Sequence, residues 1–280
     1  MSSDDRPLLS VVIANYNYGR FLGDAIESLL SQSFQGFELI VVDGGSTDNS
    51  VEVIRKYQDR IAWWCTEPDA GQSAAFNKGF SHATGRFLTW LNADDVFFPG
   101  ALAAVVKEIN RHPKGEWFVG STSWVDADLR IKRVFVAHRF SILRGYFASA
   151  SACGPSSFFT RRLLDAAGGI DETMHYAMDN DLWHRFFRKC HVRYWRTTAN
   201  VWAYRIHEDS KLSGADVSTK QKALDNRARA HQEGLELARR YPLSVCWVRP
   251  IALLFSFSVV DKIRAIYRTH KMKGRKVNEC

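Results

Sequence analysis

The sequence predicts an α/β fold in which a mostly parallel central sheet is flanked by helices, with further helices toward the C-terminus. Short apolar runs of strand length alternate with stretches whose apolar residues recur at helical spacing. Several of these runs stop abruptly at Asn, Asp or Gly, as strands do where an open α/β sheet binds its ligands. With 280 residues and 46% hydrophobic content, the chain can bury a full core.

Four apolar runs are expected to be parallel strands, at residues 9–14, 37–42, 61–65 and 87–92. Helical periodicity predicts a helix in each gap between them, at residues 21–30, 51–57 and 74–82. Strands that alternate with helices in this way imply right-handed crossovers and a parallel sheet.

The residues after the fourth strand predict a helix and then a β-hairpin. Residues 101–109 predict a helix, after which residues 117–125 and 131–136 predict two strands. The turn between these strands contains Asp126 and Asp128. Because these acids lie between two β-rich runs, they are interpreted as part of a hairpin turn and not as a ligand site.

The net charge of +8 is concentrated near the C-terminus. Residues 239–276 contain ten Lys or Arg and a single acid, Asp261, so the rest of the chain is close to neutral. A nucleic-acid-binding protein would spread its basic residues along a domain face. We therefore expect no nucleic-acid partner.

The five cysteines are scattered, odd in number and without the spacing of a zinc site, which predicts reduced thiols. The first residues lack the basic and apolar regions of a signal peptide, and no apolar stretch approaches the ~20 residues that span a bilayer. We expect a cytoplasmic protein.

The most informative stretch is residues 87–99 (FLTWLNADDVFFP), an apolar run that ends at Asn92, Asp94 and Asp95. Their hard oxygens, placed at the carboxyl end of a buried strand, suit Mg²⁺ or Mn²⁺ carrying substrate phosphates. Alternatively, Asp94 or Asp95 only caps the helix that starts near Pro99.

Asp43 also ends an expected strand, beside two glycines. An acid in this position can accept hydrogen bonds from a nucleotide's base or ribose, whereas the simpler interpretation is an Asx turn. Neither a dinucleotide fingerprint nor a P-loop motif is present in the sequence.

Five segments occur in a fixed order: SVVIANYNYGRFL, ELIVVDGGSTDNS, EPDAGQSAAFNKGFSHATG, FLTWLNADD and GGIDETMHYAMDNDLWHRF. Together they resemble family 2 glycosyltransferases with the GT-A (Rossmann-like) fold, over about residues 8–212. The resemblance implies a nucleotide-sugar donor, a divalent metal ion, Mg²⁺ or Mn²⁺, and inversion at the anomeric carbon of the sugar.

The resemblance also implies roles for individual residues on the donor side. Those expected to bind the nucleotide sugar are Ala14, Tyr16, Asp43, Asp69, Asn92, Ala93 and Asp94. Asp94 is expected to be a metal ligand and Asp95 a supporting acid. Many members have Asp where this chain has Asn92, which leaves a hydrogen-bond acceptor but removes a charge.

On the acceptor side, the resemblance aligns Asp179 with the general base and Asp181 with an acid that supports the start of a helix. Members often have Glu where this chain has Met178. His207 aligns with a histidine that completes the metal shell or contacts the diphosphate, although a lone histidine is more often structural.

These features predict an inverting transferase that moves a sugar from a UDP- or dTDP-sugar to a saccharide or lipid-linked saccharide acceptor in cell-surface polysaccharide synthesis. Two alternative functions share some of these features. A nucleotidyltransferase would share the sheet and the paired acids, but its glycine-rich, basic triphosphate loop is missing. An inactive carbohydrate-binding protein on the same fold would keep the fold without turnover.

We expect a catalytic domain at residues 1–215 and a helical extension at residues 216–280. Within the extension, residues 219–241 predict a polar, exposed helix, and residues 247–260 are strongly apolar with basic neighbours. That combination is typical of a helix that lies peripherally on the anionic inner face of the cytoplasmic membrane. The alternatives are a helix packed on the catalytic domain and a contact in a homodimer.

Overall fold

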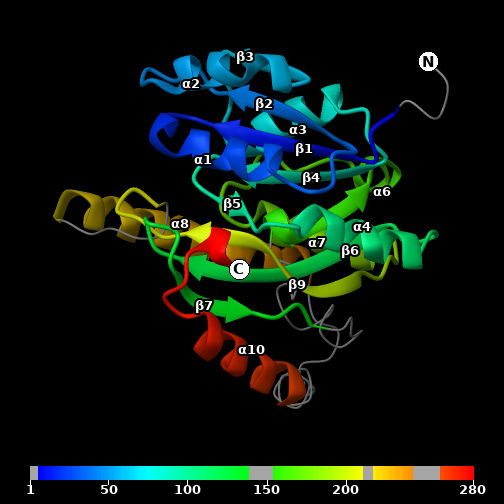
Figure 1. Ribbon diagram of the computed structural model, residues 1–280. Helices are drawn as coiled ribbons and strands as arrows, with labels where there is room; N and C mark the ends of the chain where they lie inside the picture. Colours follow the sequence, from blue (N-terminus) through cyan, green and yellow to red (C-terminus); the bar gives the residue numbers. More distant parts are fainter. Residues whose placement is uncertain (1–5, 139–153, 211–216, 242–258) are drawn as a thin grey trace.

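The computed structural model describes residues 6–138, 154–210, 217–241 and 259–280 (Figure 1). Its strands are β1 (Leu9–Asn15), β2 (Phe37–Asp43), β3 (Trp63–Thr66), β4 (Phe87–Asn92), β5 (Val96–Phe97), β6 (Trp117–Val125), β7 (Ile131–Phe135), β8 (Ser157–Thr160) and β9 (Trp195–Arg205). Its α-helices are α1 (Gly19–Leu30), α2 (Ser50–Tyr57), α3 (Gln72–His82), α4 (Ala101–Arg111), α6 (Arg161–Ala167), α7 (Met178–Arg188), α8 (Val217–Arg240) and α10 (Val259–Met272). Short 3₁₀ turns lie at Gln58–Arg60, Gly154–Ser156 and Val277–Glu279.

The described strands form one mixed sheet in the order β3-β2-β1-β4-β8-β6-β9-β5, with β7 paired to β6. Strands β1 to β4 are mutually parallel, and the helices between them make the predicted crossovers. Strands β6 and β7 form an antiparallel pair around the predicted turn, where Asp126 accepts a hydrogen bond from the backbone N–H of Arg130. The α/β prediction is therefore confirmed.

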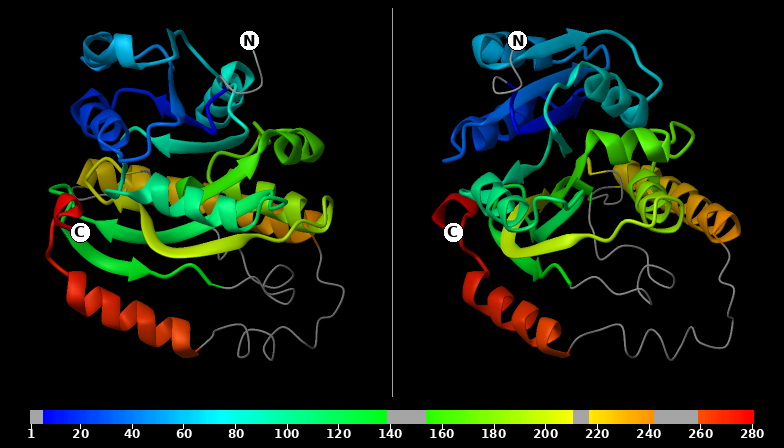
Figure 2. Two further views of the ribbon diagram at one scale, coloured as in Figure 1. Left: turned by 45° about the vertical axis from the view of Figure 1, so that its right-hand side comes forward. Right: turned by 90° about the vertical axis from the view of Figure 1, so that its right-hand side faces the viewer.

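Helices cover both faces of the sheet and create two apolar clusters (Figure 2). One cluster packs α1, α2 and α4 against the sheet, and the other packs α3, α6, α7 and α8. Residues alternate between the clusters along β4, because successive side chains of a strand point to opposite faces. Leu91 belongs to the first cluster and Trp90 to the second.

The sheet curls so that its two halves meet again beyond the carboxyl end of β4. Strand β5 follows β4 after only three residues, yet it pairs with β9, which lies three positions further along the sheet. This pairing brings the end of β4 next to the end of β9. Polar residues after both strands can therefore share one site.

The C-terminal helices are attached to the rest of the chain. The prediction that helix α8 is exposed is only partly correct, because Leu237 is buried in the second apolar cluster. Helix α10 packs along β7, and Val277 is buried beyond it. No described helix combines the length and apolar character needed to cross a bilayer. Most of the apolar run predicted at residues 247–260 lies outside the described residues.

A pair of glycine substitutions tests the packing of α3 on the sheet. A Cβ atom at Gly79 would overlap Cγ1 of Val12 on β1, whereas a Cβ atom at Gly234 of α8 would meet nothing within 4 Å. We expect Gly79→Ala to lower the free energy of unfolding by about 1–3 kcal/mol through overpacking. Gly234→Ala should raise it by roughly 0.5–1 kcal/mol, because alanine favours the helix.

Urea denaturation of both variants and of the wild type measures these changes. Gly234→Ala is the matched control, since it makes the same substitution in a helix with open space around the glycine. Two changes of the same sign would contradict the close approach of α3 to β1.

Candidate active site

A cavity of about 560 Å³ opens at the carboxyl ends of the parallel strands. Strands β1 and β4 run side by side with Ala14 opposite Asn92, so the residues that follow both strands meet at this edge. Six residues predicted from the sequence to bind the donor line the cavity: Ala14, Tyr16, Asp69, Asn92, Ala93 and Asp94. The structure thus brings together segments that are distant in the sequence.

Both polar atoms of the Asn92 side-chain amide form hydrogen bonds with neighbouring side chains. Its oxygen accepts a hydrogen bond from Nε2 of Gln72 at 2.8 Å, and its Nδ2 donates to Asp95 at 2.7 Å. An aspartate at this position could not donate to Asp95 and would instead place a second negative charge beside it. The amide therefore suits its neighbours in this chain.

Asp95 is fully buried and joins the ends of β4 and β9. Its carboxylate accepts hydrogen bonds from Asn92 and from the backbone N–H of Arg205, the latter at 2.8 Å. Burial, together with the charge of Asp94, raises the pKa of Asp95 well above its usual range. Through these contacts Asp95 links the residues that follow β4 to the end of β9.

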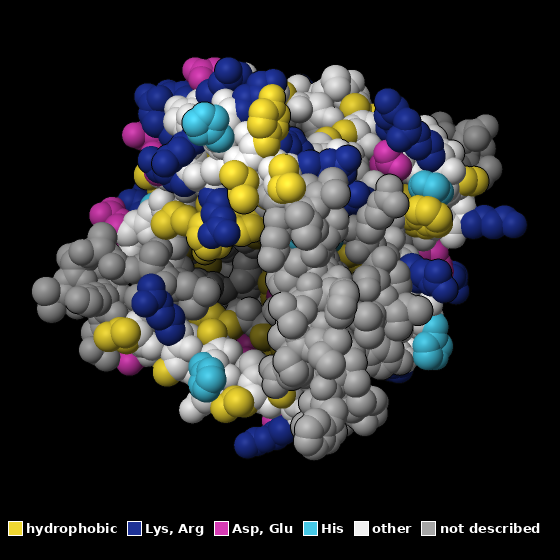
Figure 3. Space-filling view, turned by 90° about the horizontal axis from the view of Figure 1, so that it is seen from below, with side chains coloured by type: hydrophobic (Ala, Val, Ile, Leu, Met, Phe, Trp, Pro, Cys, Tyr) yellow, Lys and Arg dark blue, Asp and Glu magenta, His cyan; other side chains and the backbone are white. Residues whose placement is uncertain are grey.

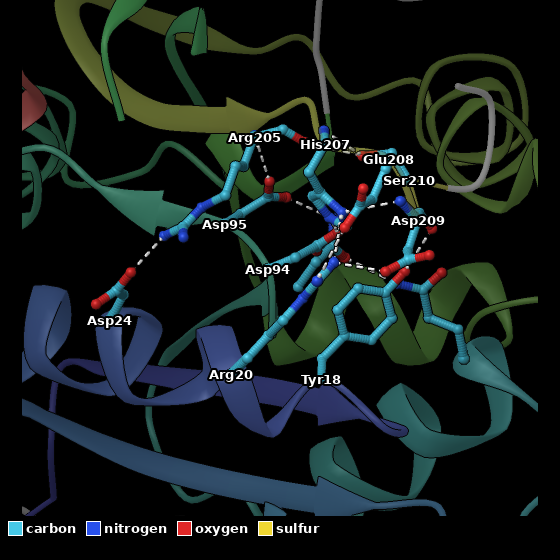
Figure 4. A network of polar contacts seen from close by, with 12 residues as sticks. Tyr18, Arg20, Asp24, Asp94, Asp95, Arg205, His207, Glu208, Asp209 and Ser210 are labelled. Carbon is cyan, nitrogen blue, oxygen red and sulfur yellow. Dashed lines mark hydrogen bonds and ion pairs between the residues drawn. The ribbon is translucent and has the colours of Figure 1, made fainter. Parts of the chain in front are cut away.

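Asp94 points away from that buried position and contacts His207 (Figure 4). The distance from its Oδ2 to Nε2 of His207 is 3.1 Å, although 113 residues separate the two in the sequence. The imidazole is buried, and its ring packs against Phe21 with a centroid distance of 4.5 Å. Nδ1 of His207 accepts a hydrogen bond from the backbone N–H of Asp209 at 3.2 Å.

This pair fits part of a divalent-cation site. Two adjacent ligands of an octahedral Mg²⁺ lie about 3 Å apart, close to the spacing of these two atoms, and such ions commonly take the remaining ligands from water and substrate phosphates. Within the described ranges, no three His, Cys, Asp or Glu side chains gather into a complete metal site. His207 could ligate through Nε2 only with its proton on Nδ1, which requires the Asp209 contact to change.

The loop that carries His207 is fixed to the start of α1. Arg20 pairs with Asp209 at 2.5 Å, and the hydroxyl of Tyr18 donates to the carbonyl oxygen of Asp209 at 3.0 Å. Arg205 pairs with Asp24 one turn further along α1, at 2.9 Å. Figure 4 shows these side chains converging from α1, the end of β4 and the end of β9.

Asp43 is buried next to the cavity, and the described residues that line the cavity do not include it. One of its oxygens accepts from Asn15 and Ser46, and the other accepts from the backbone of Ser46 and from Thr66. Burial alone would raise the pKa of Asp43, but these hydrogen bonds lower it overall. The predicted contact with a nucleobase would require one of these donors to be displaced.

Asp69 lines the cavity and follows the end of β3. Its carboxylate accepts the backbone N–H of Gly71 at 2.8 Å and lies across from Gly44, whose added Cβ would approach it to 3.0 Å. Gly71 has φ +112, a value that glycine tolerates and that lets α3 begin at Gln72. A short glycine turn therefore places Asp69 and Gln72 on the cavity wall.

Asp179 occupies the first turn of α7, where the sequence predicted a helix start. It lies beside Gly154 and not among the described residues that line the cavity. The indoles of Trp90 on β4 and Trp183 on α7 stack with centroids 5.7 Å apart, which anchors this turn to the central strand. Burial raises the pKa of Asp179, which makes its carboxylate a better proton acceptor.

Asp181 also lies in the first turn of α7, with its side chain inside the protein. It is buried, pairs with Arg185 at 2.7 Å and accepts a hydrogen bond from the hydroxyl of Tyr241 at 2.9 Å. Both of its oxygens are thus engaged inside the protein.

Several residues that line the cavity were missed in the sequence. They are Asn15, Tyr18, Gly44, Pro68, Gly71, Gln72, Ala75, His175, Tyr176 and Tyr204. Most lie inside the motifs that carry the family resemblance, so their position in a motif was the available signal. Tyr204 ends an apolar strand, and its place on the cavity depends on the curl of the sheet.

Residues 10–166 match Glycosyl transferase family 2. The chain belongs to this family. An uncharacterized glycosyltransferase of Rickettsia prowazekii is 29% identical over 194 residues, which make up 65% of this chain and 59% of that protein. The chain therefore spans less than two thirds of that relative's length.

Solved structures share the fold of this family 2 chain. Residues 1–349 of Staphylococcus aureus TarS, crystallised with UDP-GlcNAc, superpose with a TM-score of 0.61 and 18% identity, covering 92% of this chain and 78% of that one. The mannosyltransferase PcManGT from Pyrobaculum calidifontis, in complex with GDP-Man and Mn²⁺, gives a TM-score of 0.56 and 17% identity, covering 95% of this chain and 80% of that one. The expected GT-A fold is confirmed.

Proposed function

We propose that this chain is an inverting glycosyltransferase that moves a sugar from a nucleotide diphosphate sugar to a hydroxyl of a saccharide or lipid-linked saccharide. The observation that carries the proposal is the cavity at the ends of β1 and β4, which has Asp69 on one wall and Asp94 on another. Family membership supplies the reaction class. The position of Asp179 next to the central strand supports its role as the base.

We assign the nucleotide sugar to this cavity, with its diphosphate near Asp94. Asp94 would hold Mg²⁺ or Mn²⁺ together with phosphate oxygens, and His207 would support the ion as a ligand or orient Asp94. When bound, the cation stabilises negative charge on the departing nucleoside diphosphate. Gln72 orients Asn92 at the same edge, which fixes the floor of the cavity.

The transfer is a single displacement. The acceptor hydroxyl oxygen forms a bond to the anomeric carbon while the bond from that carbon to the diphosphate oxygen breaks, and the hydroxyl proton passes to the carboxylate of Asp179. Attack from the side opposite the diphosphate inverts the configuration. A neutral hydroxyl is a poor nucleophile, so removal of its proton by a positioned carboxylate is worth ~10²–10⁴ in rate.

We further propose that residues 1–215 form the catalytic domain and residues 216–280 an extension that meets a membrane surface. Helix α10 leaves Ile263, Ile266 and Tyr267 exposed, and these three share one side of the helix by their spacing. Exposed basic residues surround them, and basic and apolar side chains lie together on the face shown in Figure 3. Acidic lipids of an inner membrane leaflet would complement this combination.

The first prediction concerns the cation. We expect Asp94→Ala to abolish sugar transfer, and a chelator to abolish transfer by the wild type, because uncompensated charge on the leaving diphosphate raises the barrier. Release of nucleoside diphosphate from the donor is the measurement, and pyrophosphate release would instead indicate nucleotidyl transfer. Asp128→Ala, at an exposed acid of the hairpin turn, is the matched control. Full activity of Asp94→Ala in chelator contradicts the assignment.

The second prediction concerns the base. Asp179→Asn should bind the donor with near wild-type affinity and transfer sugar at least ~10² more slowly. Because burial raises the pKa of Asp179, the acid limb of the wild-type kcat/KM profile should lie above the usual value of an aspartate and disappear in the variant. Asp181→Asn, which alters a buried ion pair, should lower thermal stability more than the rate. Wild-type rates in Asp179→Asn, or a retained anomeric configuration, would refute the mechanism.

The third prediction concerns the nucleotide. We expect UDP or dTDP to bind more tightly than GDP. Asp43 can accept the ring N–H of a uracil or thymine base once one of its internal donors is displaced, and the family resemblance favours uridine over guanosine, whose base also has a ring N–H. Isothermal titration calorimetry with the three diphosphates in Mg²⁺ gives the comparison. Tight binding of GDP with no binding of UDP would overturn this choice.

The fourth prediction concerns the membrane. Wild-type protein should sediment with anionic vesicles and lose binding as salt is raised, since each basic residue near the surface contributes ~1 kcal/mol of screened attraction. A triple variant, Ile263→Ser, Ile266→Ser and Tyr267→Ser, should bind more weakly with unchanged folding, because all three side chains are exposed. Equal sedimentation of both proteins contradicts the membrane proposal, and a dimer lost in the variant supports the homodimer alternative.

A further inference from the structure

Helix α7 begins without a side-chain cap of its own. Its N-cap residue is Ala177, which cannot accept a hydrogen bond through its side chain, and the backbone N–H groups around a helix start need acceptors. The helix carries Asp179 in its first turn, so the way this start is held determines where the proposed base lies. The three residues that lead into the helix and end at this N-cap find their acceptor elsewhere in the chain.

Glu233 of α8 supplies the acceptor for three consecutive residues. Its Oε1 accepts from the backbone N–H of His175 at 2.9 Å, and its Oε2 accepts from the N–H groups of Tyr176 at 2.8 Å and Ala177 at 2.9 Å. Three consecutive backbone N–H groups thus point at one carboxylate and occupy both of its oxygens. Glutamine could not fill both acceptor positions without turning its NH₂ group toward an N–H donor.

The segment that Glu233 holds has two functional neighbours. His175 and Tyr176 line the proposed donor cavity, and Asp179 follows two residues after Ala177. On its other side, the carbonyl oxygen of Met174 accepts a hydrogen bond from Ser73, which is adjacent to Gln72 on the cavity wall. The segment is therefore fixed between α3 and α8.

Other contacts hold α8 itself at this place. The hydroxyl of Tyr176 donates to Asn226 at 2.6 Å, Arg240 pairs with Asp171 at 2.5 Å, and Leu237 is buried. Burial alone would raise the pKa of Asp171, but hydrogen bonds from Thr173 and Arg240 lower it to about 2, so this attachment persists at neutral pH. Glu233 thus projects from a helix whose position is determined independently of it.

We propose that Glu233 is a positioning residue. It fixes residues 175–177 so that the wall of the donor cavity and the proton acceptor Asp179 keep their positions relative to each other. The inference rests on the proposed function for its effect on the rate. Glu233 lies outside residues 10–166, so the family match assigns it no role. Glu233 would therefore affect both donor binding at the cavity wall and proton transfer to Asp179, although it lies far along the chain from most of the cavity.

The test compares Glu233→Gln with Glu236→Gln on the same helix. Glu236 is partly exposed and pairs with Arg239 and Arg240, and it makes no described contact with residues 175–177. We expect Glu233→Gln to lower kcat by ~10²-fold, the scale of a small misplacement of catalytic groups, and to raise the donor KM. Glu233→Asp, which keeps the charge, should restore part of kcat. Glu236→Gln should resemble the wild type.

Amide hydrogen exchange keeps the test independent of turnover. In Glu233→Gln the amides of residues 175–177 should exchange at least ~10-fold faster, while the amides of β1 and β4 should not change. Faster exchange with kcat and KM unchanged per folded molecule would reduce Glu233 to a purely structural contact and overturn the proposal, as would unchanged exchange. If the wild type transfers no sugar, the proposed function fails, and exchange together with UDP affinity still decides whether Glu233 holds the cavity wall.

Discussion

The hydrogen bond from the backbone N–H of Arg205 to the buried carboxylate of Asp95 closes the two halves of the sheet onto each other. Strands β4 and β9 are separated by two other strands, so a flat sheet would keep their ends apart. Because the sheet curls, Asp94 after β4 comes into contact with His207 after β9. The cost of burying an acid at Asp95 is offset because it ties together the chain segments that build the site.

Much of the parallel half could be predicted from the sequence because each element carries its own signal. Strands β1, β2 and β4 are continuous apolar runs, and α1 and α4 repeat apolar residues at helical spacing. Strand β5 has only two residues, and the first part of β9 is largely polar, so both depend on pairing partners supplied by the folded sheet. The local sequence pattern does not show which strands will pair with β5 and β9.

The candidate site shows the same division. Acids that directly follow a strand, such as Asp94, could be found because the position after a strand is itself informative. The contact between Asp94 and His207 joins residues that no spacing relates, and only the family resemblance suggested it. Glu233 was missed because a glutamate on a polar helix looks like a solvated side chain until its three backbone partners are visible. Asp43 shows the opposite case, since its position suggested a ligand while its oxygens are already filled by internal donors.

The attachment of α7 to α8 has a consequence for biosynthesis. The strands that build the donor cavity leave the ribosome well before α8, whereas the amides ahead of Asp179 gain their acceptor only after Glu233 has been made. The part of the cavity wall that contains His175 and Tyr176 is therefore held in place only after most of the chain has been synthesised.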